Sequence, residues 1–369
     1  MASVLYVSKP LSPPWNDGGK NLVRDLAEAA PRHEVAVFAG PGFAPSGARV
    51  RVHRTLGESA YAPGLAQKAA IFSTLVALPR EIRALHFFFA PNPATSTIAR
   101  VALLANRRPA VQTISSSPAD YRGVARLCFG RRVVTLSEYN RRKLEAAGVR
   151  GVVKIHPGID LTRQAQDAAG ATKWRETLGA EGRRVVLYAG DYEFSEGARL
   201  TLDAVAPLVR RVPEALVVFA CRRKTAAAGP AQARVRAEAQ ARGLSEHVRF
   251  LNEVEGMAGL LTLAEISVMP VERLYAKIDM PLVLIEHMAL GRPVVVSNTE
   301  PLVETIQNEG GIALPHGDAE RLAGAVAELL LDDRARRDAG AAARRVVEAH
   351  FDIRKSAAAY ADLYDEILP

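Results

Sequence analysis

Short apolar runs alternate with segments of helical periodicity through the first half of the chain. Residues 4–7 form an apolar run, a loop rich in Pro, Asp and Gly extends from it to Gly19, and apolar residues within 22–29 recur at helical spacing. Further strands are expected at residues 34–38, 85–89, 110–114 and 132–135. Because apolar strands alternate with helices, the pattern indicates a parallel sheet buried on both faces.

The second half repeats this pattern. A buried strand at 185–189 enters a turn at Gly190, and further strands are expected at 215–220, 248–251, 266–270 and 294–296. Helices are expected at 199–210, 257–264, 282–289, 319–331 and, with few breaks, 334–368. The helix at 282–289 ends before Gly291 and Pro293, which is typical of a helix C-terminus.

This pattern predicts an α/β protein with two doubly wound, Rossmann-like domains. We expect the first domain to cover residues 1–165 and the second to cover 166–350, with 160–182 as the connection between them. The final helical segment, 351–369, is expected to pack back on the first domain.

Composition favours a folded protein of the reducing cytoplasm. Of the 369 residues, 49% are hydrophobic, so a large core can form. The two cysteines, Cys128 and Cys221, exclude a disulfide framework or a cysteine-based zinc site. No apolar run reaches the roughly 18–20 residues of a membrane helix. We also expect no signal peptide, because the N-terminus lacks a basic region followed by an apolar core.

Charge separates the two halves. Residues 1–150 carry 21 Lys and Arg against 9 Asp and Glu, a balance of +12, and the remainder carries 27 against 31, a balance of −4. Such asymmetry predicts an anionic partner for the first half or peripheral contact with an anionic inner membrane surface, although solvated faces rich in Arg would give the same counts. The densest basic residues are Arg122, Arg126, Arg131, Arg132, Arg141, Arg142 and Lys143.

Several common chemistries leave no pattern in this sequence. The histidines form neither His-Glu-x-x-His nor His-x-x-Glu-His, and no nucleophile elbow or Walker loop occurs. Aromatic residues make up 6% of the chain and no nucleic-acid module is evident, so we expect neither a metal site nor a nucleic-acid partner.

Four segments together resemble the GT-B glycosyltransferases of family 4. They are Asp17-Gly18-Gly19 after the first strand, residues 135–139, residues 154–160 with the sequence Lys-Ile-His-Pro-Gly-Ile-Asp, and residues 281–295 around Glu286. The resemblance implies two Rossmann-like domains facing a central cleft, with the acceptor on the first and a nucleotide sugar on the second. It implies retaining transfer from a nucleotide-diphospho-sugar, which is a co-substrate, with no other cofactor and no structural metal in the donor site.

The resemblance also implies roles for individual residues. Glu286 would bind the ribose hydroxyls of the donor, since each carboxylate oxygen accepts one hydrogen bond. The alternative is that Glu286 is an ordinary exposed residue on a helix surface and binds no donor. Gly18, Gly19 and Lys20, before and within the first helix, and Gly190 would approach the donor through their backbone. An ordinary loop is the alternative for Gly18 and Gly19.

Three departures from the family's pattern concern the donor and the reacting centre. Ile278 stands where the family has a first Glu, so Asp279, or the backbone of Met280, Pro281 and Leu282, is expected to contact the sugar instead. Asp191 and Glu196 stand where the family has an Arg and a Lys that hold the diphosphate. Ser115 replaces a His near the reacting centre and cannot act as a general base at neutral pH. Glu286, Asp279 and Ser115 are the candidate catalytic residues.

Other residues would have to take the roles of the family residues that are missing here. The lost positive charge could come from Arg222, Arg223, Lys224 and Lys277, although a charge run is commonly just solvated. His86, Asn92 and Ser137 are expected on the acceptor side. For His86, a position in the hydrophobic core is equally plausible.

The sequence predicts a glycosyltransferase acting on a small-molecule, glycan or lipid-linked acceptor, in cell-surface glycan or natural-product glycoside synthesis. The missing Arg and Lys leave a sugar phosphorylase-type GT-B enzyme as an alternative. The missing Glu and His leave a non-catalytic GT-B homologue that binds a sugar or a partner.

Overall fold

The computed structural model describes residues 3–55, 64–274 and 277–368, which divide into two compact units. Unit 1 comprises residues up to Asp160, the tripeptide Lys277–Asp279, and the chain from Phe351 onward. Unit 2 comprises Leu161–Ala276 and Met280–His350. The expected boundary at 165/166 lies five residues beyond the observed one, and the assignment of 277–279 to unit 1 was not expected.

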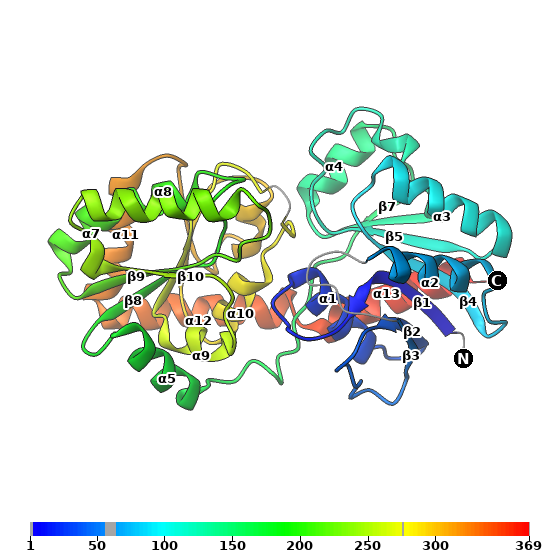
Figure 1. Cartoon of the computed structure of the whole chain (residues 1–369), viewed down its shortest axis with the longest axis horizontal. Coiled ribbons are helices and arrows are strands. Elements are labelled where there is room, and N and C mark those ends of the chain that lie inside the picture. Colours follow the sequence, from blue (N-terminus) through cyan, green and yellow to red (C-terminus); the bar gives the residue numbers. More distant parts are fainter. Residues whose placement is uncertain (1–2, 56–63, 275–276, 369) are drawn as a thin grey trace. The chain divides into compact units, whose positions relative to one another are not determined.

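Unit 1 is a parallel seven-stranded sheet in the order β3-β2-β1-β4-β5-β6-β7 (Figure 1). Its strands are β1 (Ser3–Leu11), β2 (Glu34–Ala39), β3 (Val50–Arg54), β4 (Ile82–Phe88), β5 (Ala110–Ile114), β6 (Arg132–Thr135) and β7 (Val152–Lys154). Its helices are α1 (Gly18–Glu28), α2 (Leu65–Val76), α3 (Pro93–Asn106), α4 (Glu138–Ala146) and α13 (Ile353–Ile367), with a 3₁₀ helix at Val124–Arg126.

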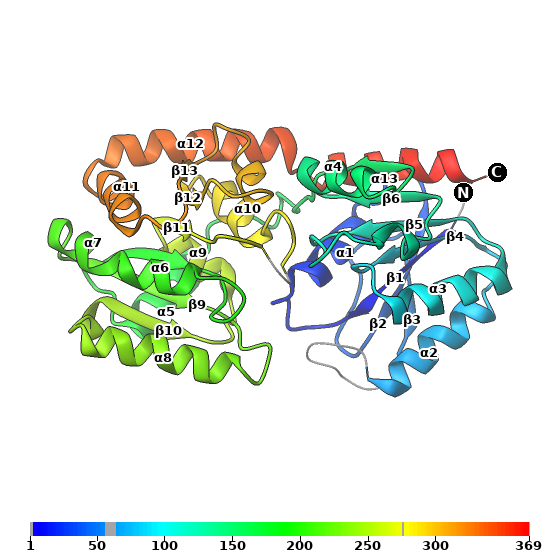
Figure 2. The same cartoon turned by 90° about the horizontal axis from the view of Figure 1, so that it is seen from above.

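Alternate residues of the unit 1 strands pack against different helices. Leu5, Phe38 and Phe87 face α2 and α3 in one apolar cluster with Leu75 and Ala102. On the other face lie α1 and α13, which contact one another (Figure 2). The strands are therefore buried on both sides, which explains their continuous apolar sequences.

Unit 2 is a parallel six-stranded sheet in the order β10-β9-β8-β11-β12-β13. Its strands are β8 (Arg184–Tyr188), β9 (Ala215–Ala220), β10 (Val248–Leu251), β11 (Ile266–Met269), β12 (Val294–Ser297) and β13 (Ile312–Leu314). Its helices are α5 (Ala168–Leu178), α6 (Gly197–Asp203), α7 (Val205–Arg211), α8 (Ala228–Ala241), α9 (Met257–Leu263), α10 (Leu282–Ala289), α11 (Ala319–Leu331) and α12 (Asp333–His350), with 3₁₀ helices at Ser245–His247 and Leu302–Ile306.

Two apolar clusters cover the faces of this second sheet. One joins the strands to α6, α7, α8 and α11, and the other joins them to α5 and α9. Figure 1 shows these two sets of helices on opposite sides of β8 and β9. The expectation of two Rossmann-like parallel-sheet domains is confirmed.

Several expected elements differ from the observed ones. β3, β7 and β13 were not anticipated; they are short and end a sheet, where the apolar signal is weak. The segment expected as a connection contains α5, whose N-cap Asp167 accepts a hydrogen bond from the Gly170 amide at 2.8 Å.

Two expected helices are each divided. The helix expected at 199–210 is two helices that meet at Ala204, and Pro207 lies in the first turn of the second, where a proline is tolerated. The tail is divided at Phe351–Asp352, where Asp352 caps α13 through the Arg354 amide at 3.0 Å.

The expected strand at 85–89 starts three residues earlier, at Ile82.

Candidate functional site

The carboxyl ends of three adjacent strands gather predicted donor-site residues at one edge of unit 2. β9, β8 and β11 are neighbours and parallel, and the strand order switches direction between β8 and β11. Doubly wound sheets bind ligands outside the carboxyl ends of the strands at such a switch point. Gly190 and Asp191 follow β8, whereas Arg222, Arg223 and Lys224 follow β9.

The turn after β8 is held by its own acidic residue. Asp191 is buried, and its Oδ1 accepts hydrogen bonds from the amides of Glu193 at 3.1 Å, Phe194 at 2.7 Å and Ser195 at 3.2 Å. Three successive amides that could have faced an anion therefore point at a carboxylate supplied by the chain. Gly190 is required by packing, since a Cβ there would lie 2.0 Å from the ring of Tyr188.

Glu196, the second acid at an expected cation position, lies on the surface. It precedes α6 and forms an ion pair with Arg199 at 2.5 Å. This pairing offsets its negative charge, so it opposes a bound anion less than the sequence suggested.

The candidate cations lie on the loop between β9 and α8. Arg222 is half-buried, while Arg223 and Lys224 are exposed, and Cys221 before them is fully buried. Thr225, next along the loop, donates a hydrogen bond to Glu193 in the turn after β8. This contact places the cationic loop beside the Asp191 turn. Lys277 belongs instead to unit 1.

Glu286 is a polar position on a mostly buried helix. Pro281 is the N-cap of α10, Met280 and Leu282 are buried, and so are most residues around Glu286, which is itself half-buried. The next residue, His287, is fully buried with Nε2 3.1 Å from the carbonyl of Ala264, and burial lowers the pKa of its imidazole to about 4. Glu286 and Val283 are thus the partly exposed residues of α10.

Asp279 lies in the interior of unit 1, held by hydroxyl and amide groups. Its Oδ2 accepts from Ser137 Oγ at 2.6 Å and from Asn140 Nδ2 at 2.9 Å, and its Oδ1 accepts from Ser117 Oγ at 2.9 Å. Its amide donates to the carbonyl of Ser115 at 3.0 Å. Burial raises the pKa of this carboxyl to about 6, although the three side-chain hydrogen bonds lower it. We call Asp279 with these four residues the Asp279 cluster.

The Asp279 cluster corrects two expectations. Asp279 is fully buried, so its carboxylate is not presented to a sugar in this structure. Ser137, expected on the acceptor side, is also fully buried; its hydroxyl donates to Asp279 and accepts from the Asn140 amide at 3.1 Å as the N-cap of α4. In this structure both side chains therefore have partners within unit 1, and Ser115 contributes a backbone carbonyl.

The glycines after β1 have their amides engaged by a neighbouring acid. Gly18 begins α1, and the N-cap Asp17 accepts from the amides of Gly19 at 3.0 Å and Lys20 at 3.2 Å. The Lys20 ammonium is buried and donates to the carbonyl of Ser12 at 2.8 Å. An anion approaching these two amides would have to displace a carboxylate.

The predicted acceptor-side residues His86 and Asn92 have structural partners. His86 is fully buried, with Nδ1 2.6 Å from the Tyr364 hydroxyl and Nε2 2.7 Å from Thr113 Oγ1. Burial lowers the pKa of its imidazole well below the usual value, so the ring is neutral. Asn92 is the N-cap of α3 and accepts from the Thr95 amide at 3.0 Å. The structure places His86 in the core, which is one of the two positions that the sequence left open for it.

Three of the seven basic residues in the densest basic stretch of the first half form ion pairs. Arg122 pairs with Asp120, Arg132 with Glu366, and Arg141 with both Glu138 and Glu145. This stretch is therefore less cationic than its sequence suggests.

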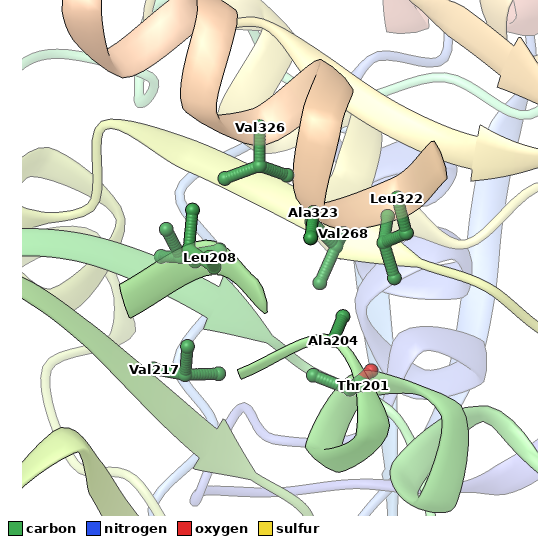
Figure 3. Close-up of a pocket in the computed structure, with 9 residues that line it drawn as sticks. Thr201, Ala204, Leu208, Val217, Val268, Leu322, Ala323 and Val326 are labelled. Atoms are coloured by element: carbon green, nitrogen blue, oxygen red, sulfur yellow. The ribbon is translucent and has the colours of Figure 1, made fainter. Parts of the chain in front are cut away.

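The cavity shown in Figure 3 carries no ligand-binding role. It is a void of about 10 Å³ in the core of unit 2, lined by apolar side chains and by Thr201, whose hydroxyl donates to the Gly197 carbonyl at 2.7 Å. A space of this size holds at most one water molecule.

Sequence reasoning missed several of these contacts. Ser117 and Asn140 were not selected, although Asn140 follows the N-cap Ser137 by three residues. Asp17 was taken only as part of a motif, yet an Asp directly before a helix is a capping signal. The segment Asp-Tyr-Glu-Phe-Ser at 191–195 was compatible with an Asp-capped turn, because Asp accepts from amides two or three residues ahead.

Two searches of the described ranges give negative findings. Within 3–55, 64–274 and 277–368, no helix is long and apolar enough to cross a membrane. In the same ranges, no group of three or more His, Cys, Asp or Glu side chains could hold a metal ion.

Comparison with known sequences finds glycosyltransferases. Residues 171–346 match the family described as glycosyl transferases group 1. The GDP-mannose-dependent alpha-(1-6)-phosphatidylinositol monomannoside mannosyltransferase of Mycobacterium tuberculosis is 29% identical over 246 residues, which are 64% of this chain and 62% of that protein. The D-inositol 3-phosphate glycosyltransferase of Corynebacterium jeikeium is 31% identical over 221 residues, 58% of this chain and 52% of that protein. The chain thus matches less than two thirds of the length of either relative.

Comparison with solved structures extends the likeness over both units. Anabaena Alr3699/HepE in complex with UDP and glucose has a TM-score of 0.78 at 18% identity, covering 99% of this chain and 100% of that one. A sucrose-phosphate synthase from Thermosynechococcus elongatus has a TM-score of 0.77 at 20% identity, covering 99% of each chain. At this identity the likeness establishes the fold. The described chain therefore has the GT-B fold, and its residues 171–346 match the family described as glycosyl transferases group 1.

Proposed function

We propose that this protein is a retaining glycosyltransferase that moves a sugar from a nucleotide-diphospho-sugar to an acceptor. The donor would bind at the carboxyl edge of the unit 2 sheet. The observation that carries the proposal is Glu286, a half-buried carboxylate on a mostly buried helix within the segment that matches the family. A carboxylate in that setting suits the paired hydroxyls of a ribose.

The diphosphate requires positive charge at the same edge. Arg222, Arg223 and Lys224 follow β9 at the switch point and can supply it. Fixed cations stabilise the charge that develops on the leaving phosphate, and that phosphate can itself take the proton of the acceptor. The reaction then needs no general base, which is consistent with the serine at position 115.

The acceptor we propose carries a phosphate. Two relatives are named for phosphatidylinositol monomannoside and for D-inositol 3-phosphate, so a lipid-linked or phosphorylated polyol is the class we favour. Synthesis of a cell-surface glycan on the cytoplasmic side of the membrane would use such an acceptor. The donor base stays open between guanine and uracil, because the mannosyltransferase is named as GDP-mannose-dependent and the HepE complexes contain UDP.

A non-catalytic GT-B homologue is the second candidate. It is favoured by Asp191, whose carboxylate occupies three amides of the turn at the proposed donor edge. A homologue of this kind would bind no nucleoside diphosphate, and a phosphorylase-type enzyme would respond to a sugar phosphate instead.

Thermal unfolding with UDP, GDP, ADP, dTDP and CMP separates these candidates. We expect one nucleoside diphosphate to raise the midpoint specifically. Glu286→Ala should weaken its binding by about 1–3 kcal/mol, because two hydrogen bonds to the ribose are lost. The matched control is Glu328→Ala, which removes an exposed Glu from α11 in the same unit and should change nothing.

The cationic loop is tested in the same assay. Arg222→Ala combined with Lys224→Ala should abolish the stabilisation by the nucleotide, whereas Arg234→Ala on α8 should not alter it. If no nucleotide stabilises the wild-type protein, the transferase proposal is wrong. If Glu286→Ala binds as tightly as wild type, the assignment of Glu286 is wrong.

A further inference from the structure

Exposed large apolar side chains are concentrated on two helices of unit 1. In the described ranges the exposed ones are Leu65, Phe72 and Val76 on α2, Ile98, Val101 and Leu104 on α3, and Leu331 in unit 2. Leu65 is 85% exposed and Leu104 is 78% exposed. Single exposed apolar residues are ordinary, but a contiguous group of them marks an interaction site.

The exposed apolar residues form a stripe along each helix. On α2, Leu65, Phe72 and Val76 are separated by seven and four residues, and exposed Ala69 lies between the first two. Residues with these separations fall on one side of a helix. On α3, Ile98 and Val101 follow the same spacing from exposed Ala94, with Leu104 three residues further on.

Both stripes face outward from the same side of the sheet. The opposite side of α2 places Leu75 in the core cluster of unit 1, and the opposite side of α3 places Ala99 and Ala102 there. The two helices contact each other, and Figure 2 shows them side by side over one face of the sheet. Their outward sides therefore make one surface, which we call the α2/α3 face.

Positive charge predominates in and next to the two helices of the α2/α3 face. Neither helix contains an Asp or Glu. Across residues 64–109 there are six Lys and Arg against one acid, Glu81. Lys68, Arg80, Arg83 and Arg107 are exposed, and no ion pair in the described part of the chain involves them. The basic stretch at 122–143 differs, because Arg122, Arg132 and Arg141 there are paired with acids.

We propose that the α2/α3 face binds the surface of an anionic bilayer. The apolar stripes would enter the region between headgroups and acyl chains, and the basic residues would contact anionic headgroups. A second copy of the chain is a poorer occupant, because a symmetric interface would set this positive charge against itself. The proposal goes beyond the transfer reaction and does not depend on it.

Cosedimentation of the full chain with vesicles tests this proposal. We expect binding to vesicles of phosphatidylcholine with phosphatidylglycerol in equal parts and little binding to phosphatidylcholine alone. Raising the salt to roughly 0.5 M should weaken the binding, since the charge contribution is screened. Leu65→Gln combined with Leu104→Gln should reduce the affinity at least about tenfold. Both side chains are highly exposed, so the variant should keep the wild-type circular dichroism and unfolding midpoint.

A matched variant and an optical probe complete the test. Leu331→Gln removes the exposed leucine of unit 2, 60% exposed, and should bind vesicles like wild type. Phe72→Trp should shift its emission to shorter wavelength when anionic vesicles are added, while Leu331→Trp should not. The proposal is overturned if the wild-type chain does not bind anionic vesicles. It is equally overturned if Leu331→Gln loses as much binding as Leu65→Gln combined with Leu104→Gln. It is also overturned if light scattering shows a dimer that only Leu65→Gln with Leu104→Gln dissociates.

Discussion

Asp279 in unit 1 and Asp191 in unit 2 are both buried, and each unit supports its carboxylate by different means. Asp279 is held by two hydroxyls and an amide from the side chains of Ser117, Ser137 and Asn140. Asp191 is held by three backbone amides of its own turn. The first arrangement joins segments far apart in the sequence, whereas the second is local. Removing the carboxylate should therefore have more severe consequences in unit 1.

Asp279→Ala should cause the largest loss of stability. It leaves two hydroxyls and an amide without their acceptor inside unit 1, and each buried unsatisfied group costs about 1–3 kcal/mol. We expect the free energy of unfolding of unit 1 to fall by about 4 kcal/mol in total. The two tryptophans make the measurement specific, since Trp15 lies in unit 1 and Trp174 in unit 2. Denaturation of a Trp174→Phe background therefore reports on unit 1.

Asp120→Ala is the control for that experiment. Asp120 is an exposed acid of unit 1 paired with Arg122, and its loss should leave the transition where it was. If Asp279→Ala unfolds at the same denaturant concentration as this control, the Asp279 cluster does not support unit 1.

The titration of Asp279 should give the next largest effect. Its pKa in the folded protein, about 6, is above the 3.8 of an unperturbed aspartate, so folding favours the protonated form. The corresponding stability is fully present below about pH 4 and is lost as the pH rises through 6, with a total near 3 kcal/mol. Asp279→Asn cannot titrate, so the difference in unfolding free energy between wild type and this variant should change by that amount between pH 4 and pH 7.

This comparison isolates one group, because the other titrating side chains are common to both proteins. A difference that stays constant over the same range would mean that the carboxyl is not buried in solution as it is in the structure.

The two carboxylates also show which features of the structure can be predicted from the sequence and which cannot. Apolar strands and helical spacing sufficed for both sheets, because β1, β8 and β9 are buried on both sides and carry strong patterns. The edge strands β3 and β13 were not predicted, because their half-exposed residues do not form a continuous apolar run. The loop after β9 and the position of Glu286 were found through their order along the chain. The Asp279 cluster could not be found that way, because it joins residues 139–162 positions apart in the sequence.

Asp191→Ala should have the smallest effect on stability. The turn loses one acceptor shared by three amides, but those amides are only part-buried and water can replace much of the lost bonding. We expect the free energy of unfolding of unit 2 to fall by about 2 kcal/mol, measured by Trp174 fluorescence in a Trp15→Phe background. Asp191→Asn keeps the Oδ1 acceptor and should lose less than half as much.

The asparagine variant also decides what the charge of Asp191 does at the proposed donor edge. If a diphosphate binds near the turn, removing one negative charge should strengthen nucleoside diphosphate binding severalfold, because at an effective dielectric near 20 a like charge several ångströms away costs about 1 kcal/mol or more. Glu196→Gln is the matched control, since that exposed acid is already offset by Arg199 and should matter less. Equal gains from both variants would place the phosphates nearer α6, and no gain from either would show that the anion binds away from the Asp191 turn.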